Sequence, residues 1–154
     1  MHGPDTQALT IVLERAQAAR DEAALALQRA EQQRERVQAQ AVQLQQYRAE
    51  YIERWSAQFQ RQSAIEIVHC YRSFMLRLDQ ALAQQRSIVE RQTQTVAACR
   101  GTLVETEVRV AGIRKLIDRR RQEHQRAASR QEQKQVDESA QRAGWTSGPR
   151  SAFL

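Results

Sequence analysis

The sequence predicts an all-α protein, a long antiparallel two-helix coiled-coil hairpin with an overhanging C-terminal helix. Leu, Ala, Arg, Gln and Glu dominate the chain, and all five are good helix formers because they lose little rotamer freedom in a helix. The only two prolines are Pro4 and Pro149. Two long stretches repeat apolar residues with the heptad spacing of coiled coils. We therefore expect one coiled-coil domain over residues 1–154.

The first predicted helix runs from about residue 6 to 57, and its apolar residues recur every seven positions in two series. One series is Leu9, Ala16, Ala23, Ala30, Val37, Leu44 and Tyr51, and the other is Leu13, Arg20, Leu27, Arg34, Ala41, Arg48 and Trp55. We call these fourteen positions the seam of this helix, and eleven of them are apolar. The heptad period predicts a left-handed supercoil.

The second predicted helix runs from about residue 64 to 143 and has one strong and one weak series. The strong series is Met75, Leu82, Val89, Val96, Leu103, Val110 and Ile117, and the mixed series is Tyr71, Leu78, Gln85, Gln92, Cys99, Thr106 and Ile113. These fourteen positions are the seam of the second helix. The heptad period is lost between the two helices, which predicts a turn at about residues 58–63. Ser63 and Glu66 form a capping-box pattern at the start of the second helix.

A short turn makes the two helices antiparallel. If positions whose numbers add to about 122 face each other, no layer of the seam contains two polar residues. For example, Val37 then faces Gln85. This register leaves the second helix without a partner beyond about Ile117, and we call residues 118–143 the basic arm. A disordered tail is expected over residues 144–154, because Gly144 is a typical helix stop.

The net charge of +6 raises the question of nucleic-acid binding. Residues 5–57 contain seven arginines and eight acidic residues, in the mixed pattern of a solvated helix surface. The excess lies between Arg114 and Arg142, with nine basic and five acidic residues. We expect no nucleic-acid partner. The basic arm is either a solvated surface or a segment that becomes ordered on binding a protein.

Nothing in the sequence indicates an enzyme, a metal site or a cofactor. His2, His69 and His124 share no metal-ligand spacing with one another or with the cysteines. Cys70 and Cys99 are 29 positions apart on one predicted helix, which is about 43 Å and too far for a disulfide. We find no secretion signal or membrane-length apolar stretch. These features predict a soluble protein of the cytoplasm.

Aromatic residues gather near the predicted turn. Six of the eight aromatic residues are Tyr47, Tyr51, Trp55, Phe59, Tyr71 and Phe74. Those on seam positions are expected to lock the helices together. Tyr47 and Phe74 lie off the seam, so we expect them to face a partner.

Three segments resemble the FliJ family of flagellar export proteins. They are Leu44-Gln-Gln-Tyr47-Arg-Ala-Glu50-Tyr51, then Tyr71-Arg-Ser-Phe74 followed by Leu78, Gln80 and Ala81, and finally Gln133 to Arg142. The resemblance extends from about Leu9 to Arg142. It implies a component of the flagellar type III export apparatus, similar in shape to the two-helix stalk of the rotary ATPase γ subunit.

The resemblance also implies partners and a location. The partners are the hexameric export ATPase, FliI, the cytoplasmic linker of the export gate, FlhA, and export chaperones. The location is the cytoplasmic face of the inner membrane, which the chain reaches only through its partners. Alternatives are the equivalent stalk of a virulence-type type III secretion system and a general helical scaffold.

The family's surfaces carry over to particular positions of this sequence. Those implied to bind the export gate are Gln40, Leu44, Tyr47, Tyr51, Phe74, Leu78, Ala81 and Gln85. By analogy with the stalk, the open end of the hairpin enters the ATPase ring, and the residues implied to bind there are Leu9, Leu13, Arg120, Arg121, Lys134 and Asp137.

Overall fold

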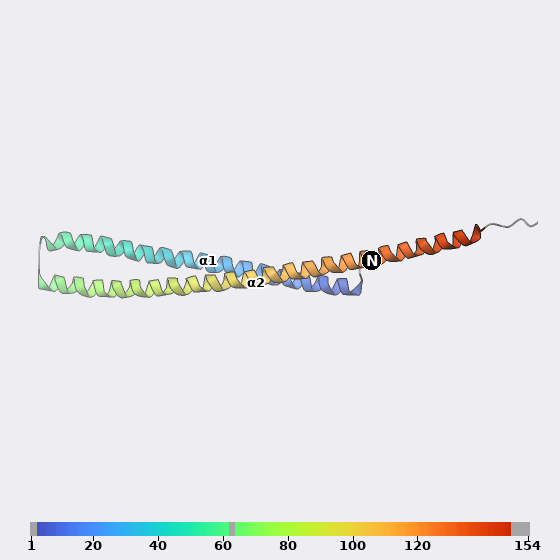
Figure 1. Cartoon of the computed structure of the whole chain (residues 1–154). Helices are drawn as coiled ribbons and strands as arrows, with labels where there is room; N and C mark the ends of the chain where they lie inside the picture. Colours follow the sequence, from blue (N-terminus) through green and yellow to red (C-terminus); the bar gives the residue numbers. More distant parts are fainter. Residues whose placement is uncertain (1–2, 62–63, 149–154) are drawn as a thin grey trace, which may run out of the picture. The chain divides into compact units, whose positions relative to one another are not determined.

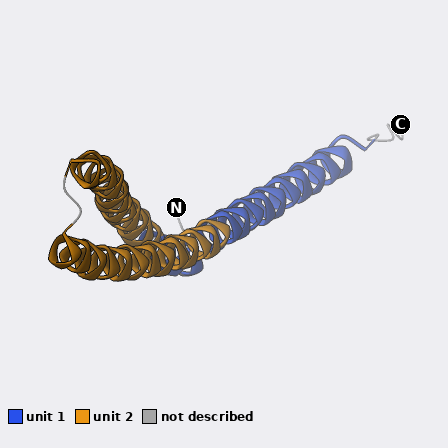
Figure 2. Ribbon diagram, turned by 90° about the vertical axis from the view of Figure 1, so that its left-hand side faces the viewer, with its two compact units in different colours: residues 1–16, 109–154 blue, residues 17–108 orange. Residues whose placement is uncertain are grey.

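A computed structural model describes residues 3–61 and 64–148 of the chain. Over these residues it contains two long α-helices and no strand, with α1 at Pro4–Phe59 and α2 at Ile65–Thr146 (Figure 1). The prediction of an all-α protein with two long helices packed against each other is confirmed. The chain divides into two compact units (Figure 2), unit 1 with residues 1–16 and 109–154 and unit 2 with residues 17–108.

The first helix begins two residues before its predicted start. The backbone N–H groups of Thr6 and Gln7 donate to the carbonyl oxygen of Gly3 at 2.9 and 3.4 Å. Pro4 then occupies the first helical position, which suits proline because its ring sets a helical φ and no N–H is needed there. The heptad pattern, whose first residue is Leu9, predicts a later start at about residue 6.

The connection between the helices runs from residue 60 to residue 64. The structure describes residues 60, 61 and 64 of it, and residues 62 and 63 lie outside the described residues. The N–H of Arg61 donates to the carbonyl oxygen of Gln58 at 3.1 Å, and α1 ends at Phe59. The carbonyl oxygen of Ala64 accepts from Ile67 and Val68 at 3.1 and 3.3 Å, which marks the start of α2. Ser63 of the predicted capping box lies outside the described residues.

The second helix continues three residues past its predicted end at Ala143, through Gly144. Its last turn is capped by two hydroxyl groups. Thr146 Oγ1 donates to the carbonyl oxygen of Ala143 at 2.9 Å, and Ser147 Oγ donates to the same oxygen at 2.7 Å. The same oxygen also accepts the backbone N–H of Ser147 at 3.2 Å, so the helix continues past Gly144. Residues 149–154 of the predicted tail lie outside the described residues.

Within unit 2 the two helices run antiparallel with their seams in contact. The seam residues Ala23, Ala30, Val37, Ala41, Leu78, Leu82 and Val96 are buried. Gln85 Nε2 donates to the carbonyl oxygen of Val37 at 2.9 Å, and Gln92 Nε2 donates to that of Ala30 at 3.2 Å. In both pairs the residue numbers add to 122, the register that the sequence favours. The backbone can come close here because alanine and valine line this part of α1.

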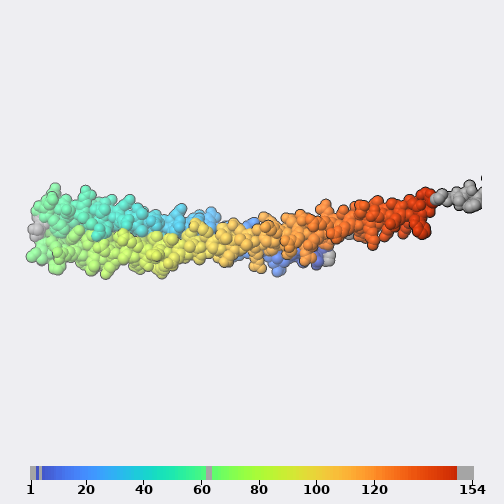
Figure 3. Space-filling model, in the orientation of Figure 1, coloured from blue at the N-terminus to red at the C-terminus, as the bar shows by residue number. Residues whose placement is uncertain are grey.

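Within unit 1 the start of α1 packs against the middle of α2, at about residues 110–120. Ala16, Val110 and Ile117 are buried, with 7%, 2% and 5% of their surface exposed. Thr6 is also buried, one heptad before Leu13, at a seam position that the sequence count did not include. Every residue from 118 to 148 is exposed, and Figure 3 shows this stretch in orange to red.

No helix over residues 3–61 and 64–148 is both long enough and apolar enough to cross a membrane.

Candidate partner-binding surfaces

Six aromatic rings form one cluster in unit 2, with Tyr51 at its centre. The ring of Tyr51 lies 4.2 Å from that of Phe74 and 5.8 Å from that of Trp55, between centroids. It also stacks on the rings of Tyr47 and Tyr71, each with centroids 6.2 Å away. Phe59 extends the cluster towards the turn, edge-on to Tyr71 at 5.2 Å. These rings come from both helices, so the cluster holds this end of unit 2 together.

The eight residues implied to bind the export gate lie along one side of unit 2. Leu44, Tyr51, Leu78 and Gln85 are seam residues, and Gln40, Tyr47, Phe74 and Ala81 each directly precede a seam residue. Two contacts join the helices on this side in addition to that of Tyr51 with Phe74. Tyr47 and Phe74 meet edge to face at 6.3 Å between centroids, and Gln85 Nε2 donates to Gln40 Oε1 at 3.1 Å. We call these eight residues the aromatic side.

The residues of the aromatic side differ in how far they are exposed to solvent and so in how accessible they are to a partner. Leu78 has 7% of its surface exposed and Tyr47 has 47%. Gln40 and Ala81 are exposed, whereas Leu44, Tyr51, Phe74 and Gln85 are partly buried. Tyr47 is therefore the exposed aromatic residue of this side, and the ring of Phe74 lies partly buried against it.

The opposite side of unit 2 carries a charged pair. Arg48 Nε donates to Asp79 Oδ1 at 2.6 Å. This hydrogen bond, and next the negative charge of Asp79, raise the pKa of Arg48 above its ordinary value. Arg48 is one of three arginines on the seam of α1, and Asp79 directly follows the seam residue Leu78. The pair lets a seam arginine leave the apolar layer and keep its stem packed there.

The residues implied to bind the ATPase all belong to unit 1. Leu9 and Leu13 are partly buried against α2, so they support the surface of the helix pair. Arg120 lies 3.7 Å from Asp5 of α1, measured from Nη1 to Oδ2. Arg121, Lys134 and Asp137 are exposed, and Gln133 Nε2 donates to Asp137 Oδ1 at 3.5 Å. The exposed residues are spread along α2 and form no single cluster.

Trp145 is a candidate that the sequence analysis missed. Gly144 predicts a helix stop and a disordered tail that includes Trp145. The structure instead places it in the last turn of α2, with 91% of its surface exposed. The signal that could have revealed it is the pair of capping residues that follow it, Thr146 and Ser147.

Within residues 3–61 and 64–148, no group of three or more His, Cys, Asp or Glu side chains is placed to hold a metal ion. Cys70 and Cys99 are free thiols. What the described residues offer is exposed helix surface: an aromatic side in unit 2 and a basic, exposed stretch of helix in unit 1.

Comparison with known proteins gives one match. A family model described as "Flagellar FliJ protein" matches residues 6–149. No curated protein and no solved structure matches the chain. The matched range includes the aromatic side, the basic arm and Trp145.

Proposed function

Because the chain belongs to the flagellar FliJ protein family, we propose that it is the stalk of the flagellar type III export apparatus. In this role it binds the hexameric export ATPase, promotes its assembly and turnover, and links it to the export gate. The observation that carries the proposal is the family match, which covers residues 6–149. The family is a component of flagellar export, which favours an interaction function over an enzymatic one.

The proposal includes a finer description of the fold. The chain would form one antiparallel coiled-coil hairpin, a single domain over residues 1–154 with an overhanging C-terminal helix. Two observations support this. The seam bonds from Gln85 and Gln92 keep one register over a heptad, and every residue from 118 to 148 is exposed.

For the export gate, the proposed binding surface is the aromatic side. Tyr47 and Phe74 support this choice because each combines a large ring with accessible surface, and aromatic residues often dominate binding energy at interfaces. The gate would contribute an extended segment, its cytoplasmic linker, that lies along this side. Leu78 and Tyr51 would act by holding the rings of Tyr47 and Phe74 in place.

For the ATPase, the proposed binding surface is the open end of the hairpin together with the basic arm. Seven basic and five acidic residues lie between positions 118 and 143. Such mixed charges allow contacts that break and re-form as ring subunits change state. A stalk that binds some ATPase states better than others shifts the ring towards those states. This is how a protein without an active site can promote assembly and turnover.

We place the protein in the cytoplasm, at the face of the inner membrane where the export apparatus lies. It would reach the membrane only through its partners. A role in recycling export chaperones is part of the same proposal. Neither a cofactor nor nucleic acid has a part in it.

The proposal is tested by mixing the full chain with the purified export ATPase. ATP hydrolysis and hexamer formation should both rise. The double substitution Arg120→Glu and Arg121→Glu should weaken both effects. The matched control, Arg29→Glu with Arg36→Glu, makes the same change of charge at exposed positions of unit 2 and should leave both effects intact. No change of hydrolysis or assembly with the wild-type chain would contradict the proposal.

Gate binding has its own test. Tyr47→Ala with Phe74→Ala should reduce the affinity for a gate linker fragment by at least about tenfold, as expected for hot-spot residues. Helicity measured by circular dichroism should stay the same. The control substitution, Ile52→Ala, removes an apolar side chain of α1 that is not part of the aromatic side. Loss of helicity in the double variant would mean that the two rings are structural.

The closest alternative is the equivalent stalk of a virulence-type secretion system. The same hydrolysis assay with the ATPase of such a system distinguishes the two, because the stalk should stimulate its own ATPase more strongly. A general scaffold that stimulates neither ATPase is the remaining alternative.

A further inference from the structure

The last part of α2 carries its charges unevenly. Every residue from 118 to 146 is exposed, and we call this segment the exposed stretch. Its first half, residues 118–130, contains five basic and two acidic residues, whereas residues 131–146 contain two basic and three acidic residues. Two copies of the segment lying antiparallel would each set a net basic half against a net acidic half. A second copy of this chain is therefore complementary in charge.

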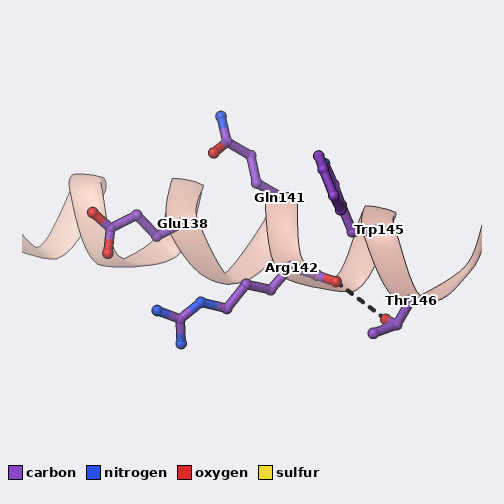
Figure 4. Close-up of a pocket in the computed structure, with 5 residues that line it drawn as sticks. All are labelled: Glu138, Gln141, Arg142, Trp145 and Thr146. Carbon is purple, nitrogen blue, oxygen red and sulfur yellow. Dashed lines mark hydrogen bonds between the residues drawn. The ribbon is translucent and has the colours of Figure 1, made fainter.

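The heptad pattern of α2 continues through the exposed stretch. Counting in sevens from the seam residue Ile117 gives His124, Gln131, Glu138 and Trp145, and counting from Ile113 gives Arg120, Ala127, Lys134 and Gln141. Figure 4 shows the side chains of Gln141 and Trp145 extending from one side of the helix and that of Arg142 from the other. The two series thus continue the seam as an exposed face that mixes apolar, amide and charged side chains.

One antiparallel register pairs complementary side chains in every layer of this face. A layer can take one residue from each series, as Trp55 and Tyr71 do in unit 2 with ring centroids 5.8 Å apart. If two copies face each other with position numbers that add to 272, the layers are Trp145 with Ala127, Glu138 with Lys134 and Gln131 with Gln141. A large ring then meets a small side chain, a carboxylate meets an ammonium group, and an amide meets an amide.

Other registers are less complementary. A shift of seven positions in either direction sets Trp145 opposite Arg120 or Lys134. Neither shift leaves a basic residue opposite Glu138 in its layer. The two-fold symmetry of a dimer repeats each layer, so these mismatches would count twice. The sequence of the exposed stretch therefore favours one register for self-pairing.

A flanking pair of charges supports the same register. In unit 2, Tyr47 and Phe74 each directly precede a seam residue and meet across the helices at 6.3 Å between centroids. Their position numbers add to five less than those of the Trp55 layer. The same offset in the dimer sets Arg130 of one copy beside Asp137 of the other, and each of these also directly precedes a seam position. Opposite charges would thus meet at both flanks.

We propose that two copies of this chain associate through their exposed stretches, which pair as an antiparallel two-stranded coiled coil centred at position 136. This proposal goes beyond the proposed function and does not depend on it. Polar seam residues fix a register at some cost in stability, so the dimer is weak and exchanges its chains. The exposed stretch overlaps the surface proposed to bind the ATPase, so self-pairing would compete with that binding.

Disulfide trapping tests the register. Cys70 and Cys99 are first replaced by serine, and a chain with Gln131→Cys is then mixed with a chain with Gln141→Cys. On mild oxidation the unlike chains should cross-link at least about tenfold faster than in the control mixture. The control combines Gln133→Cys with Ser139→Cys, whose numbers also add to 272 but which lie off the seam. Mass spectrometry identifies the product as a dimer of unlike chains.

A charge exchange tests the layers. Lys134→Glu would place two carboxylates in each of two layers, so it should weaken self-association by at least about tenfold in sedimentation equilibrium. Adding Glu138→Lys to the same chain exchanges the charges within each layer and restores the net charge. This double variant should associate like the wild type to within about twofold. Circular dichroism checks that all three chains are equally helical.

The outcomes decide the proposal. A wild-type chain that stays monomeric at every concentration measured overturns it. So does cross-linking at equal rates in the two mixtures, or a dimer that Lys134→Glu leaves unchanged, because association would then use another surface. Neither measurement contains the ATPase, so the proposed function is tested separately.

Discussion

The side-chain amide of Gln85 on α2 donates a hydrogen bond to the backbone carbonyl oxygen of Val37 on α1, at 2.9 Å. Gln92 makes the same kind of bond to Ala30 one heptad away, at 3.2 Å. Val37 is buried, so the amide of Gln85 occupies a position that an apolar side chain would fill in an ordinary coiled coil. Polar seam residues of this kind fix which layers face each other, at some cost in stability.

The first prediction concerns this cost. Gln85→Leu should raise the free energy of unfolding by about 1 kcal/mol, because the leucine buries apolar surface against Val37 while the carbonyl keeps its helical hydrogen bond. Urea unfolding followed by circular dichroism measures the change. A decrease of similar size would mean that the amide bond stabilises the protein more than an apolar contact does.

The second prediction concerns the pair of Arg48 and Asp79. A double-mutant cycle with Arg48→Ala and Asp79→Ala should give a small favourable coupling energy that shrinks as salt is added, because both side chains are partly exposed to solvent. Since the pair raises the pKa of Arg48 from an already high value, the guanidinium stays charged at all pH values near neutrality. Its contribution is present below its unfolded-state pKa and is lost only as the pH rises through the raised value, so this group gives no pH dependence near neutrality.

The third prediction compares the contributions of Tyr51 and Tyr47 to the stability of the aromatic cluster. Tyr51→Ala should lower the free energy of unfolding by about 3 kcal/mol, because its ring packs on four others. Tyr47→Ala should cost about 1 kcal/mol or less, since the side chain is 47% exposed. Thermal unfolding of the two variants provides the comparison. Equal losses would contradict the distinction between a central ring and an accessible one.

The fourth prediction tests the packing of unit 1. Cysteines at Leu13 and Val110, with Cys70 and Cys99 replaced by serine, should form a disulfide within one chain on mild oxidation. Non-reducing gel electrophoresis and mass spectrometry distinguish this product from cross-linked dimers. Cross-links found only between chains would reject the register.

Heptad spacing was sufficient to predict the helices and the seam, because in a coiled coil the same repeat decides both secondary structure and packing. It could not predict where the helices end. Those ends depend on Pro4 at the first helical position and on the hydroxyls of Thr146 and Ser147, which are single-residue effects outside the repeat. Thr6, a buried polar residue, was missed for a related reason, since the repeat was counted from the first leucine.

The candidate surfaces were predictable to a different degree. Off-seam aromatic residues pointed to Tyr47 and Phe74, and the structure brings their rings within 6.3 Å of each other. The partner of Arg48 was not predictable, because a seam arginine can leave the layer towards either flank. Trp145 was missed because glycine before it favours a helix end, and only the capping bonds show that the helix continues.

The central claim is that one molecule binds the export ATPase and the export gate at the same time. Sedimentation velocity of the full chain with the ATPase hexamer and a gate linker fragment tests it most directly. A three-component complex should form only when the chain is present. Tyr47→Ala with Phe74→Ala should release only the gate fragment, and Arg120→Glu with Arg121→Glu should release only the ATPase. Binding of the two partners that is mutually exclusive would contradict the account.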